Sequence, residues 1–216
     1  MRMIFIGPPG SGKGTQAQLL SQRLGLLHFA TGDILRDAVA KDTPEGQRAK
    51  PFMTGGQLVP DIIVNDIVNA RLRSKNRPVK FIMDGYPRTL AQANSFDAVL
   101  KEQGLDLDAV VFLNVGDEEI VRRNGARWTC INPECKATYN TLTRPPLTPG
   151  RCDLCQHLLY QREDDDPATI RRRLQYFHEQ AAGILDHYAR QGRLIEVPGR
   201  GDIEAIYASI VKALGK

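Results

Sequence analysis

Short apolar runs alternate with longer amphipathic stretches along this chain. The runs are four to seven residues long, and they lie at residues 3–6, 26–29, 79–83, 109–115 and 194–197. Runs of this length are typical of buried strands, and the stretches between them have helical patterns. The alternation predicts an α/β fold in which helices cover both faces of a parallel sheet.

Capping residues mark the expected helix starts. Thr43 and Asp166 each precede a proline, and Asp202 precedes the apolar stretch 203–214. A side-chain oxygen placed before the first turn satisfies free backbone N–H groups, and proline fits there because it has no N–H to satisfy. The pair Gly55-Gly56 is expected to end the helix that starts after Thr43.

Helical periodicity is also clear over residues 61–74. The alternation of expected strands and helices breaks near residue 127. The helix 61–74 is expected to carry an apolar face made of Ile62, Ile63, Ile67 and Ala70. Residues 127–161 are rich in turn residues and in residues that favour extended structure, so we interpret them as an inserted lobe.

Length and composition are those of an ordinary soluble protein. The 216 residues suit one domain with insertions, and 42% of them are hydrophobic and 25% charged. A net charge of +4 is mild and alone indicates neither a nucleic-acid-binding nor a membrane-surface protein. No apolar run approaches the roughly 18 residues that span a bilayer, and the chain opens with a strand, so we expect a cytoplasmic protein.

All four cysteines lie in the inserted lobe. Cys130 and Cys135 form one pair, and Cys152 and Cys155 form a second pair after sixteen intervening residues. In a reducing compartment such pairs indicate tetrahedral zinc rather than disulfides, although His157 is an alternative ligand. Four thiolates leave no open position on the ion, so we predict a structural zinc that holds together a lobe without a core of its own.

The clearest chemical signature follows the first apolar run. Residues 7–15 read Gly-Pro-Pro-Gly-Ser-Gly-Lys-Gly-Thr between a strand and a helix-competent stretch. Glycines let backbone N–H groups turn inward around an anion, the helix N-terminus adds partial positive charge, and Lys13 reaches the outer phosphates. The residues expected to hold a nucleotide here are Gly10, Ser11, Gly12, Lys13, Gly14 and Thr15.

Gly14 stands where this loop usually has a Ser or Thr whose hydroxyl holds Mg²⁺. Because Mg²⁺ gives up its waters reluctantly, we expect it to lie between nucleotide and protein within a hydrated shell. Asp84 ends the strand 79–83, at the edge where open parallel sheets place their ligands, and its carboxylate suits such a hydrated ion. A simple strand-end turn is the alternative role for Asp84.

Four segments of the chain together resemble one enzyme family. They are residues 7–15, 31–36 and 84–88, and the run 162–165 followed by Arg173. Each segment is weak evidence by itself, but their combination resembles the adenylate kinase family in its long-lid form with a zinc-binding lid. The resemblance implies a P-loop three-layer fold with a five-stranded parallel sheet and two insertions. It implies a core at residues 1–29, 60–125 and 163–216, a helical monophosphate-binding insertion at 30–59, and a lid at 126–162.

The same resemblance implies a Mg²⁺-dependent enzyme that transfers a phosphoryl group reversibly from ATP to AMP, giving two ADP. Such an enzyme is expected to be a monomer that binds neither nucleic acid nor membrane. Phosphoryl transfer needs positioning and neutralisation of charge, which cations from several directions supply. The groups implied to act on the transferred phosphoryl are Lys13, Asp84, Arg88, Arg123, Arg162 and Arg173.

The remaining implied contacts divide between the two nucleotides. On the ATP side, in addition to the loop, they are Arg123, Arg127, Thr138, Tyr139 and Gly201. On the AMP side they are Thr31, Arg36, Gln57, Leu58, Val59, Gly85, Tyr86, Pro87, Arg88, Gln92, Arg162 and Arg173. Asp33 is either an accessory to the magnesium site or a helix cap, and the carboxylates of Asp164 and Asp165 are expected to orient lid arginines.

Two residues near the expected donor base depart from the family pattern. Two alternative functions also stay open for the chain. Trp128 stands where a basic residue often follows Arg127, and Asn140 stands where histidine often follows Thr138-Tyr139. A kinase for UMP, CMP or GMP is one alternative, although a glutamine amide such as that of Gln92 suits adenine. A zinc-ribbon nucleic-acid module is the other, but acidic residues interrupt the basic ones in the lobe.

Overall fold

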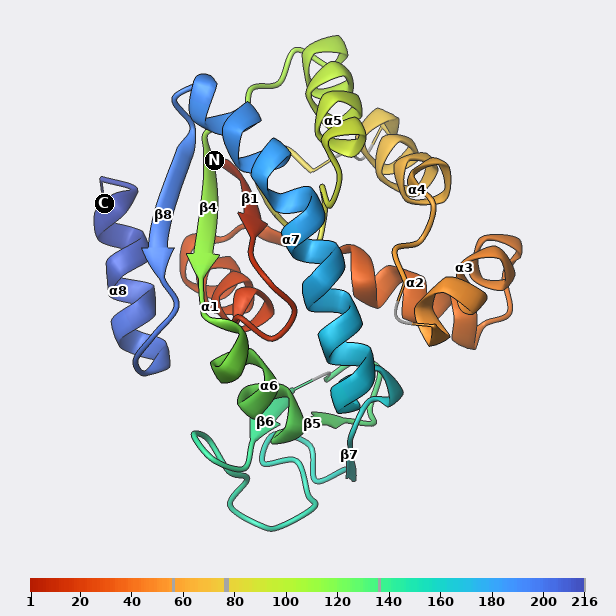
Figure 1. Ribbon diagram of the computed structural model, residues 1–216, viewed down its shortest axis with the longest axis vertical. Coiled ribbons are helices and arrows are strands. Elements are labelled where there is room, and N and C mark those ends of the chain that lie inside the picture. Colours follow the sequence, from red (N-terminus) through yellow and green to blue (C-terminus); the bar gives the residue numbers. More distant parts are fainter. Residues whose placement is uncertain (56, 76–77, 136, 216) are drawn as a thin grey trace.

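A five-stranded parallel sheet forms the centre of the computed structural model, which describes residues 1–55, 57–75, 78–135 and 137–215 (Figure 1). The spatial order of the strands is β2-β3-β1-β4-β8. Their bounds are β1 Arg2–Ile6, β2 Leu27–Ala30, β3 Phe81–Asp84, β4 Ala109–Asn114 and β8 Leu194–Pro198. The predicted α/β class and the five predicted strands are confirmed, with ends that shift by one or two residues.

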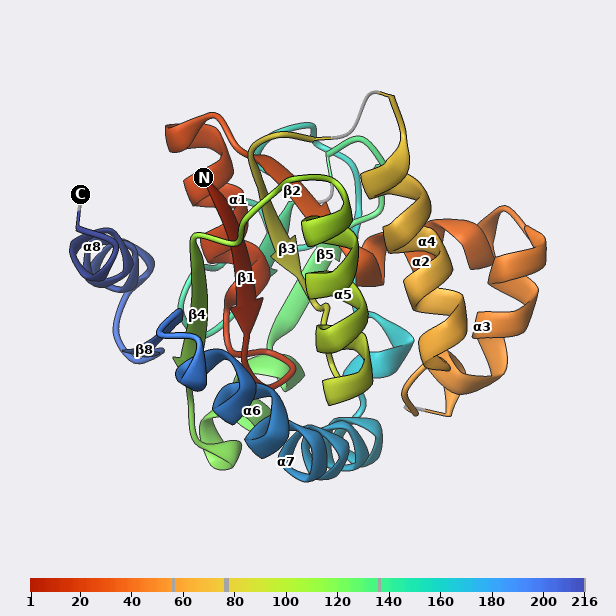
Figure 2. The ribbon, with the colours of Figure 1, turned by 90° about the horizontal axis from the view of Figure 1, so that it is seen from above.

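The two faces of the sheet have separate hydrophobic cores. Successive side chains of a strand point to opposite faces, so Ile4 and Ile6 of β1 join one core while Met3 and Phe5 join the other. Figure 2 shows α1 and α8 on one side of the sheet and α5 and α7 on the other. The bounds of these helices are α1 Lys13–Leu24, α5 Leu90–Glu102, α7 Pro167–Arg190 and α8 Ile203–Ala213.

The parallel register brings the functional segments to one edge of the sheet. In β1, Ile4 lies opposite Met83 of β3 and Val110 of β4. Because neighbouring strands run in the same direction, their carboxyl ends meet at this edge. The loop after β1, the end of β3 at Asp84 and the end of β4 therefore lie together, below the strands as drawn in Figure 1.

The predicted helix caps are present in the structure. The Thr43 side chain accepts a hydrogen bond from the backbone N–H of Gly46, Asp166 caps α7 and Asp202 caps α8. Helix α3 spans Pro44–Thr54 with Gly55 as its C-cap. Gly56, the other residue expected to end this helix, lies outside the described residues.

Two groups of elements extend from the carboxyl edge. Helices α2 (Thr31–Ala40) and α3 lie beside the sheet, next to α4 (Asp61–Arg73). Helix α6 (Asp117–Gly125) leads into the inserted lobe, and the 3-10 turn η1 (Glu163–Asp165) leads out of it. The lobe has its own antiparallel sheet, ordered β6-β5-β7. Its strands are β5 Arg127–Cys130, β6 Thr138–Asn140 and β7 Leu159–Tyr160.

The inserted lobe has a small core of its own, contrary to expectation. Tyr139 and Leu159 are buried there together with Cys130 and Cys152, while Trp128 packs against them. Among the described residues of the whole chain, no helix is long and apolar enough to cross a bilayer.

The predicted apolar face of α4 is wrong in part. Ile63 is buried with 3% of its surface exposed, but Ile62 is 62% exposed and Ala70 also lies at the surface. The buried side of α4 consists of Ile63, Val64, Val68 and Leu72. Apolar residues occur on both sides of this helix, and packing against its neighbours selects one side.

Replacing Ile63 with alanine is expected to lower the free energy of unfolding by about 2–5 kcal/mol, because a buried side chain leaves a cavity. Replacing the neighbouring exposed Ile62 with alanine is expected to cost less than about 1 kcal/mol. Urea denaturation of both variants measures the difference. Equal losses would show that α4 buries the face predicted from sequence.

Candidate active site

The loop after β1 wraps around the ammonium group of Lys13. Helix α1 begins at Lys13, and Gly12 before it has a φ of 96°, in the left-handed region that favours glycine. Lys13 Nζ donates hydrogen bonds to the carbonyl oxygens of Gly7 at 2.7 Å and Pro8 at 2.8 Å. The ammonium is thus held over the loop, beside first-turn N–H groups that have no acceptor within the helix.

The site disfavours the positive charge that Lys13 carries. Burial lowers the pKa of Lys13 from 10.5 to about 7. The carboxylate of Asp84 opposes this shift, and three guanidinium groups add to it, those of Arg88, Arg173 and Arg127. A bound polyanion would reverse the balance, because its negative charge stabilises the ammonium form.

Asp84 lies at the end of β3, between the phosphate loop and β2. His28 Nε2 of β2 lies 3.3 Å from Asp84 Oδ2. Burial opposes ionisation of Asp84, but the hydrogen bond with His28 and the charge of Lys13 outweigh it, so the pKa of this carboxyl is lowered. A Cβ at Gly14 would lie 3.3 Å from Asp84 Oδ2. A hydroxyl side chain at position 14 would therefore crowd the carboxylate.

Acidic residues hold several of the expected phosphate-binding arginines. Arg36 Nη2 donates to Asp33 Oδ1 at 2.5 Å, and Arg173 Nη1 donates to Asp164 Oδ2 at 2.6 Å. Asp164 Oδ2 also lies 4.0 Å from Arg36 Nη1, so one carboxylate joins α2 to α7. Arg127 of the lobe forms a two-point ion pair with Asp165, whose side chain is buried. Asp164 and Asp165 thus hold arginines, while Asp33 does so from the first turn of α2.

Among the described residues, Arg88 and Arg162 have no carboxylate paired directly with either guanidinium group. Burial lowers the pKa of Arg88 to about 10, and the charge of Arg173 adds to the effect. Burial also lowers the pKa of Arg162 to about 10, and there the charge of Arg36 adds to it. Arg162 donates to the hydroxyl of Thr129 at 3.2 Å. Arg36 and Arg173 both contact Asp164 Oδ2, so guanidinium groups lie close together here, as expected of a site that binds an anion.

The turn after β3 is held by a hydrogen-bonded network around Gln92. Gln92 is 2% exposed, and its Oε1 accepts the backbone N–H of Arg88 at 2.7 Å. Its Nε2 donates to Asp61 Oδ1 at 2.7 Å. Arg88 Nε donates to the carbonyl of Gly85 at 2.7 Å. In this conformation the carboxamide of Gln92 is buried, and it holds the turn.

The other residues expected on the AMP side have mixed environments. Thr31 is buried and donates to the carbonyl of Asp84 at 3.1 Å. Tyr86 is fully buried in the core, and its hydroxyl donates to Asn65 Oδ1 at 2.6 Å. The Tyr86–Pro87 peptide bond is cis. Between α3 and α4 the structure has Val59 buried in the core, Leu58 half-buried and Gln57 exposed.

The expected donor-side residues are distributed between α6, the lobe and the turn before α8. Arg123 donates to Glu119 Oε1 at 2.6 Å and to the carbonyl of Gly199 at 2.9 Å, which ties α6 to the turn that includes Gly201. Thr138 is half-buried in β6. Tyr139 is 2% exposed, and its hydroxyl lies 3.4 Å from Cys152 Sγ. The Tyr139 ring therefore belongs to the lobe core, and no face of it is free for stacking on a base.

The two departures from the family pattern have structural roles. Asn140 Nδ2 donates to the carbonyl of Arg123 at 2.9 Å, and Asn140 Oδ1 accepts N–H groups from Leu142 and Thr143. Asn140 thus links the lobe to the end of α6. Trp128 lines an apolar cavity of about 260 Å³ in the lobe, together with three prolines and Leu159.

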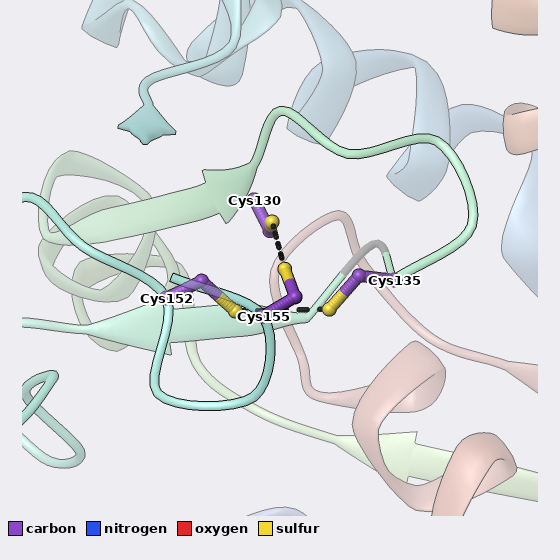
Figure 3. A group of neighbouring side chains, drawn as sticks. All are labelled: Cys130, Cys135, Cys152 and Cys155. Atoms are coloured by element: carbon purple, nitrogen blue, oxygen red, sulfur yellow. Dashed lines mark hydrogen bonds between the residues drawn. The ribbon is translucent and has the colours of Figure 1, made fainter. Parts of the chain in front are cut away.

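The four cysteine sulfurs converge in the inserted lobe (Figure 3). All four lie within 4.8 Å of one another, and the pairs Cys130–Cys155 and Cys135–Cys152 are 3.4 and 3.7 Å apart. Tetrahedral thiolates around zinc at about 2.3 Å are separated by about 3.8 Å, so this cluster fits the ion. The His157 ring is exposed, and its Nδ1 lies 2.9 Å from the Cys155 carbonyl, so the structure brings together four thiols without it.

Sequence reasoning missed two polar residues beside the site. His28 contacts Asp84, and Asn124 of α6 donates a hydrogen bond to the carbonyl of Pro9 at 3.2 Å. Neither residue belongs to a motif, and each contacts a site residue far away in sequence. The order of the strands and the position of α6 bring them there.

Comparison with known proteins agrees with this geometry. The sequence model of the family described as "Adenylate kinase" matches residues 5–193. The chain is 44% identical over 216 residues to the adenylate kinase of Archaeoglobus fulgidus, covering 100% of this chain and 99% of that protein. It is 44% identical over 215 residues to that of Caldicellulosiruptor bescii and 41% identical over 216 residues to that of Moorella thermoacetica, with the same coverage of each chain.

The P-loop fold, the cationic sheet edge and these matches define a phosphotransferase. The chain belongs to the adenylate kinase family. This membership confirms the resemblance found in the sequence and the reaction that it implied, the reversible conversion of ATP and AMP into two ADP.

Nucleotide binding is expected to take up protons at pH 8. Because the pKa of Lys13 is about 7, this amine is mostly neutral at pH 8 in the free protein, and bound phosphates raise its pKa. Titration calorimetry with ATP in buffers of different ionisation enthalpy measures the uptake. Lys13→Arg is the matched control, because arginine keeps its charge at this pH. Equal uptake by both proteins would assign the proton to another group.

Proposed function

We propose that this enzyme holds ATP and AMP with their phosphates facing each other at the carboxyl edge of the sheet. The phosphate loop and Lys13 bind the donor phosphates, with Arg123 from α6 and Arg127 from the lobe. The observation that carries this assignment is the convergence of cations whose pKa values are lowered by burial and by one another. A phosphoryl group in transfer has charge spread over its oxygens, and such a cluster neutralises it.

The acceptor occupies the side formed by β3, α2 and the segment before α4. Arg36 and Arg88 bind the AMP phosphate, where a planar guanidinium contacts two oxygens at once. Arg162 and Arg173 lie between the two nucleotides and act on the transferred group. Thr31, Gln57, Leu58, Val59 and the turn 85–87 complete this side. The Gln92 amide can donate to adenine only after its hydrogen bond to Asp61 breaks. The hydrogen-bonded network around Gln92 therefore opens when AMP binds.

Asp84 is the group that holds magnesium, through the waters of the ion. Members of this family use Mg²⁺. The lowered pKa of Asp84 keeps the carboxylate ionised at neutral pH, and its neighbour Gly14 leaves the space that a hydrated ion needs. When bound, the ion neutralises charge on the donor phosphates.

The core, the monophosphate-binding insertion 30–59 and the lid 126–162 are three parts that move relative to one another. Support comes from the lobe having its own sheet and core. Closure of the lid excludes water, which limits transfer to solvent. Thr138 and the backbone around Tyr139 flank the donor base from the lid, and the turn at Gly201 flanks it from the core. One chain supplies every group named, which supports an enzyme that acts as a monomer, and the thiolate zinc site suits the reducing cytoplasm.

The proposed reaction is tested by tracing ³²P from the γ-phosphate of ATP with AMP, UMP, CMP and GMP in turn. AMP is expected to be the preferred acceptor, and Lys13→Met is expected to lower kcat by about 10²–10⁴-fold because it removes a charge that stabilises the transition state. Unchanged metal content and melting temperature in that variant are the control. Preference for another monophosphate would replace AMP as the acceptor, and full activity of Lys13→Met would remove this residue from the mechanism.

Zinc is expected to stabilise the lid and not to take part in chemistry. Chelation of the ion should increase hydrogen exchange in residues 126–162, with little change in the parallel sheet, because four thiolates supply part of the stability of this lobe. Cys135→Ser should act in the same way. Leu147→Ser, at an 89% exposed position of the same lobe, is the control that keeps the metal. A folded metal-free enzyme without activity at low temperature would contradict a purely structural zinc.

A further inference from the structure

Asn124 is a buried asparagine at the end of α6 that contacts the phosphate loop. Only 1% of its surface is exposed. Its Nδ2 donates one hydrogen bond to the Pro9 carbonyl at 3.2 Å and another to the Ile120 carbonyl, in its own helix, at 2.9 Å. Both N–H groups of the amide are therefore used, and one of them joins segments 115 residues apart.

The amide group fills the space beside Gly10. A Cβ on Gly10 would overlap the Asn124 carboxamide, most severely at Nδ2, the atom that donates to Pro9. Gly10 has a φ of 83°, in the left-handed region. The loop therefore turns at Gly10 directly against Asn124, and the position of this side chain constrains the loop backbone.

The carbonyl oxygen of Asn124 is an unpaired acceptor. Asn124 Oδ1 is buried and has no hydrogen-bond partner among the described residues. Burying such an oxygen is unfavourable, and an apolar side chain of similar size would avoid the cost. What the asparagine supplies, and an apolar residue lacks, is the donor to Pro9. An unfavourable group that contacts a functional loop indicates a role in that loop.

We propose that Asn124 is a positioning residue for the donor nucleotide. Its amide fixes the orientation of the Pro9 carbonyl, and through it the N–H groups that the loop presents to the phosphates. The inference rests on the proposed function, which assigns this loop to ATP. Asn140 donates a hydrogen bond to the carbonyl of Arg123, the residue before Asn124. The end of α6 thus bonds to the phosphate loop on one side and to the inserted lobe on the other.

Asn124→Ala is expected to raise the KM for ATP about tenfold, the effect of one buried hydrogen bond, and to leave the KM for AMP within twofold. A rise in the KM for ATP without a rise in the KM for AMP identifies an effect on the loop, because general loosening of the fold would weaken the binding of both substrates. Asn69→Ala is the matched control. Asn69, in α4, also has a buried Oδ1 without a partner among the described residues, and its replacement should change neither KM.

Asn124→Asp provides a second test, because an aspartate side chain has nearly the same shape as an asparagine side chain. The ionised carboxylate cannot donate to Pro9, so the KM for ATP should rise at pH 8. Burial raises the pKa of such a carboxyl, and the protonated form has an O–H that donates to a carbonyl. Between pH 8 and pH 5.5 the ratio of the KM for ATP to that of the wild type should therefore fall severalfold.

The possible outcomes distinguish a failure of the proposed function from a failure of the positioning role of Asn124. A wild-type enzyme that forms no ADP from ATP and AMP overturns the proposed function itself. An active wild type, with Asn124 variants that show an unchanged KM for ATP or equal increases for both substrates, overturns the positioning role. If Asn124→Ala does not fold, as judged by its melting temperature, the pH profile of Asn124→Asp decides alone.

Discussion

The burial of several cations near one another is the constraint on which this structure depends. Lys13, Arg88 and Arg162 lie close enough at one sheet edge for burial and neighbouring charges to lower their pKa values. A folded protein tolerates such a cluster only when other groups compensate for it. The loop carbonyls accept hydrogen bonds from Lys13, and the carboxylates of Asp164 and Asp165 pair with arginines from three separate elements. These contacts hold the cations in place in the free protein, and in the proposed function the substrate phosphates complete the charge balance of the site.

Much of the fold was predictable because the sequence signals were local. Five apolar runs marked the strands, and capping residues such as Asp166 and Asp202 marked the helix starts. The phosphate loop and the cysteine pairs have fixed spacings, so residue type and position were sufficient to find them. The face of α4 was not predictable in the same way. Ile62 and Ile63 are adjacent and chemically identical, and only contacts with other elements bury one of them.

The parts of the site that escaped prediction depend on contacts between distant segments. The positions of His28 beside Asp84 and of Asn124 beside Pro9 follow from sheet order and helix placement, which no short motif encodes. Gln92 and Tyr139 show the opposite case. The resemblance indicated that both residues contact bases, but the structure has the Gln92 amide bonded to Asp61 and the Tyr139 ring inside the lobe core. A family motif indicates the contacts of a residue in the ligand-bound enzyme. In the free protein the same residue can have other hydrogen-bond partners.

The strict alternation of β1 between two cores has an evolutionary consequence. Met3 and Phe5 belong to the core that includes residues of α1 and α8, whereas Ile4 and Ile6 belong to the core that includes residues of α4, α5 and α7. Substitutions that share no neighbours have nearly additive effects on stability. Each layer can therefore accumulate compensating changes without adjustment in the other. Relatives of this protein should show correlated substitutions within each layer and few between layers, while the backbone of the central sheet stays in place.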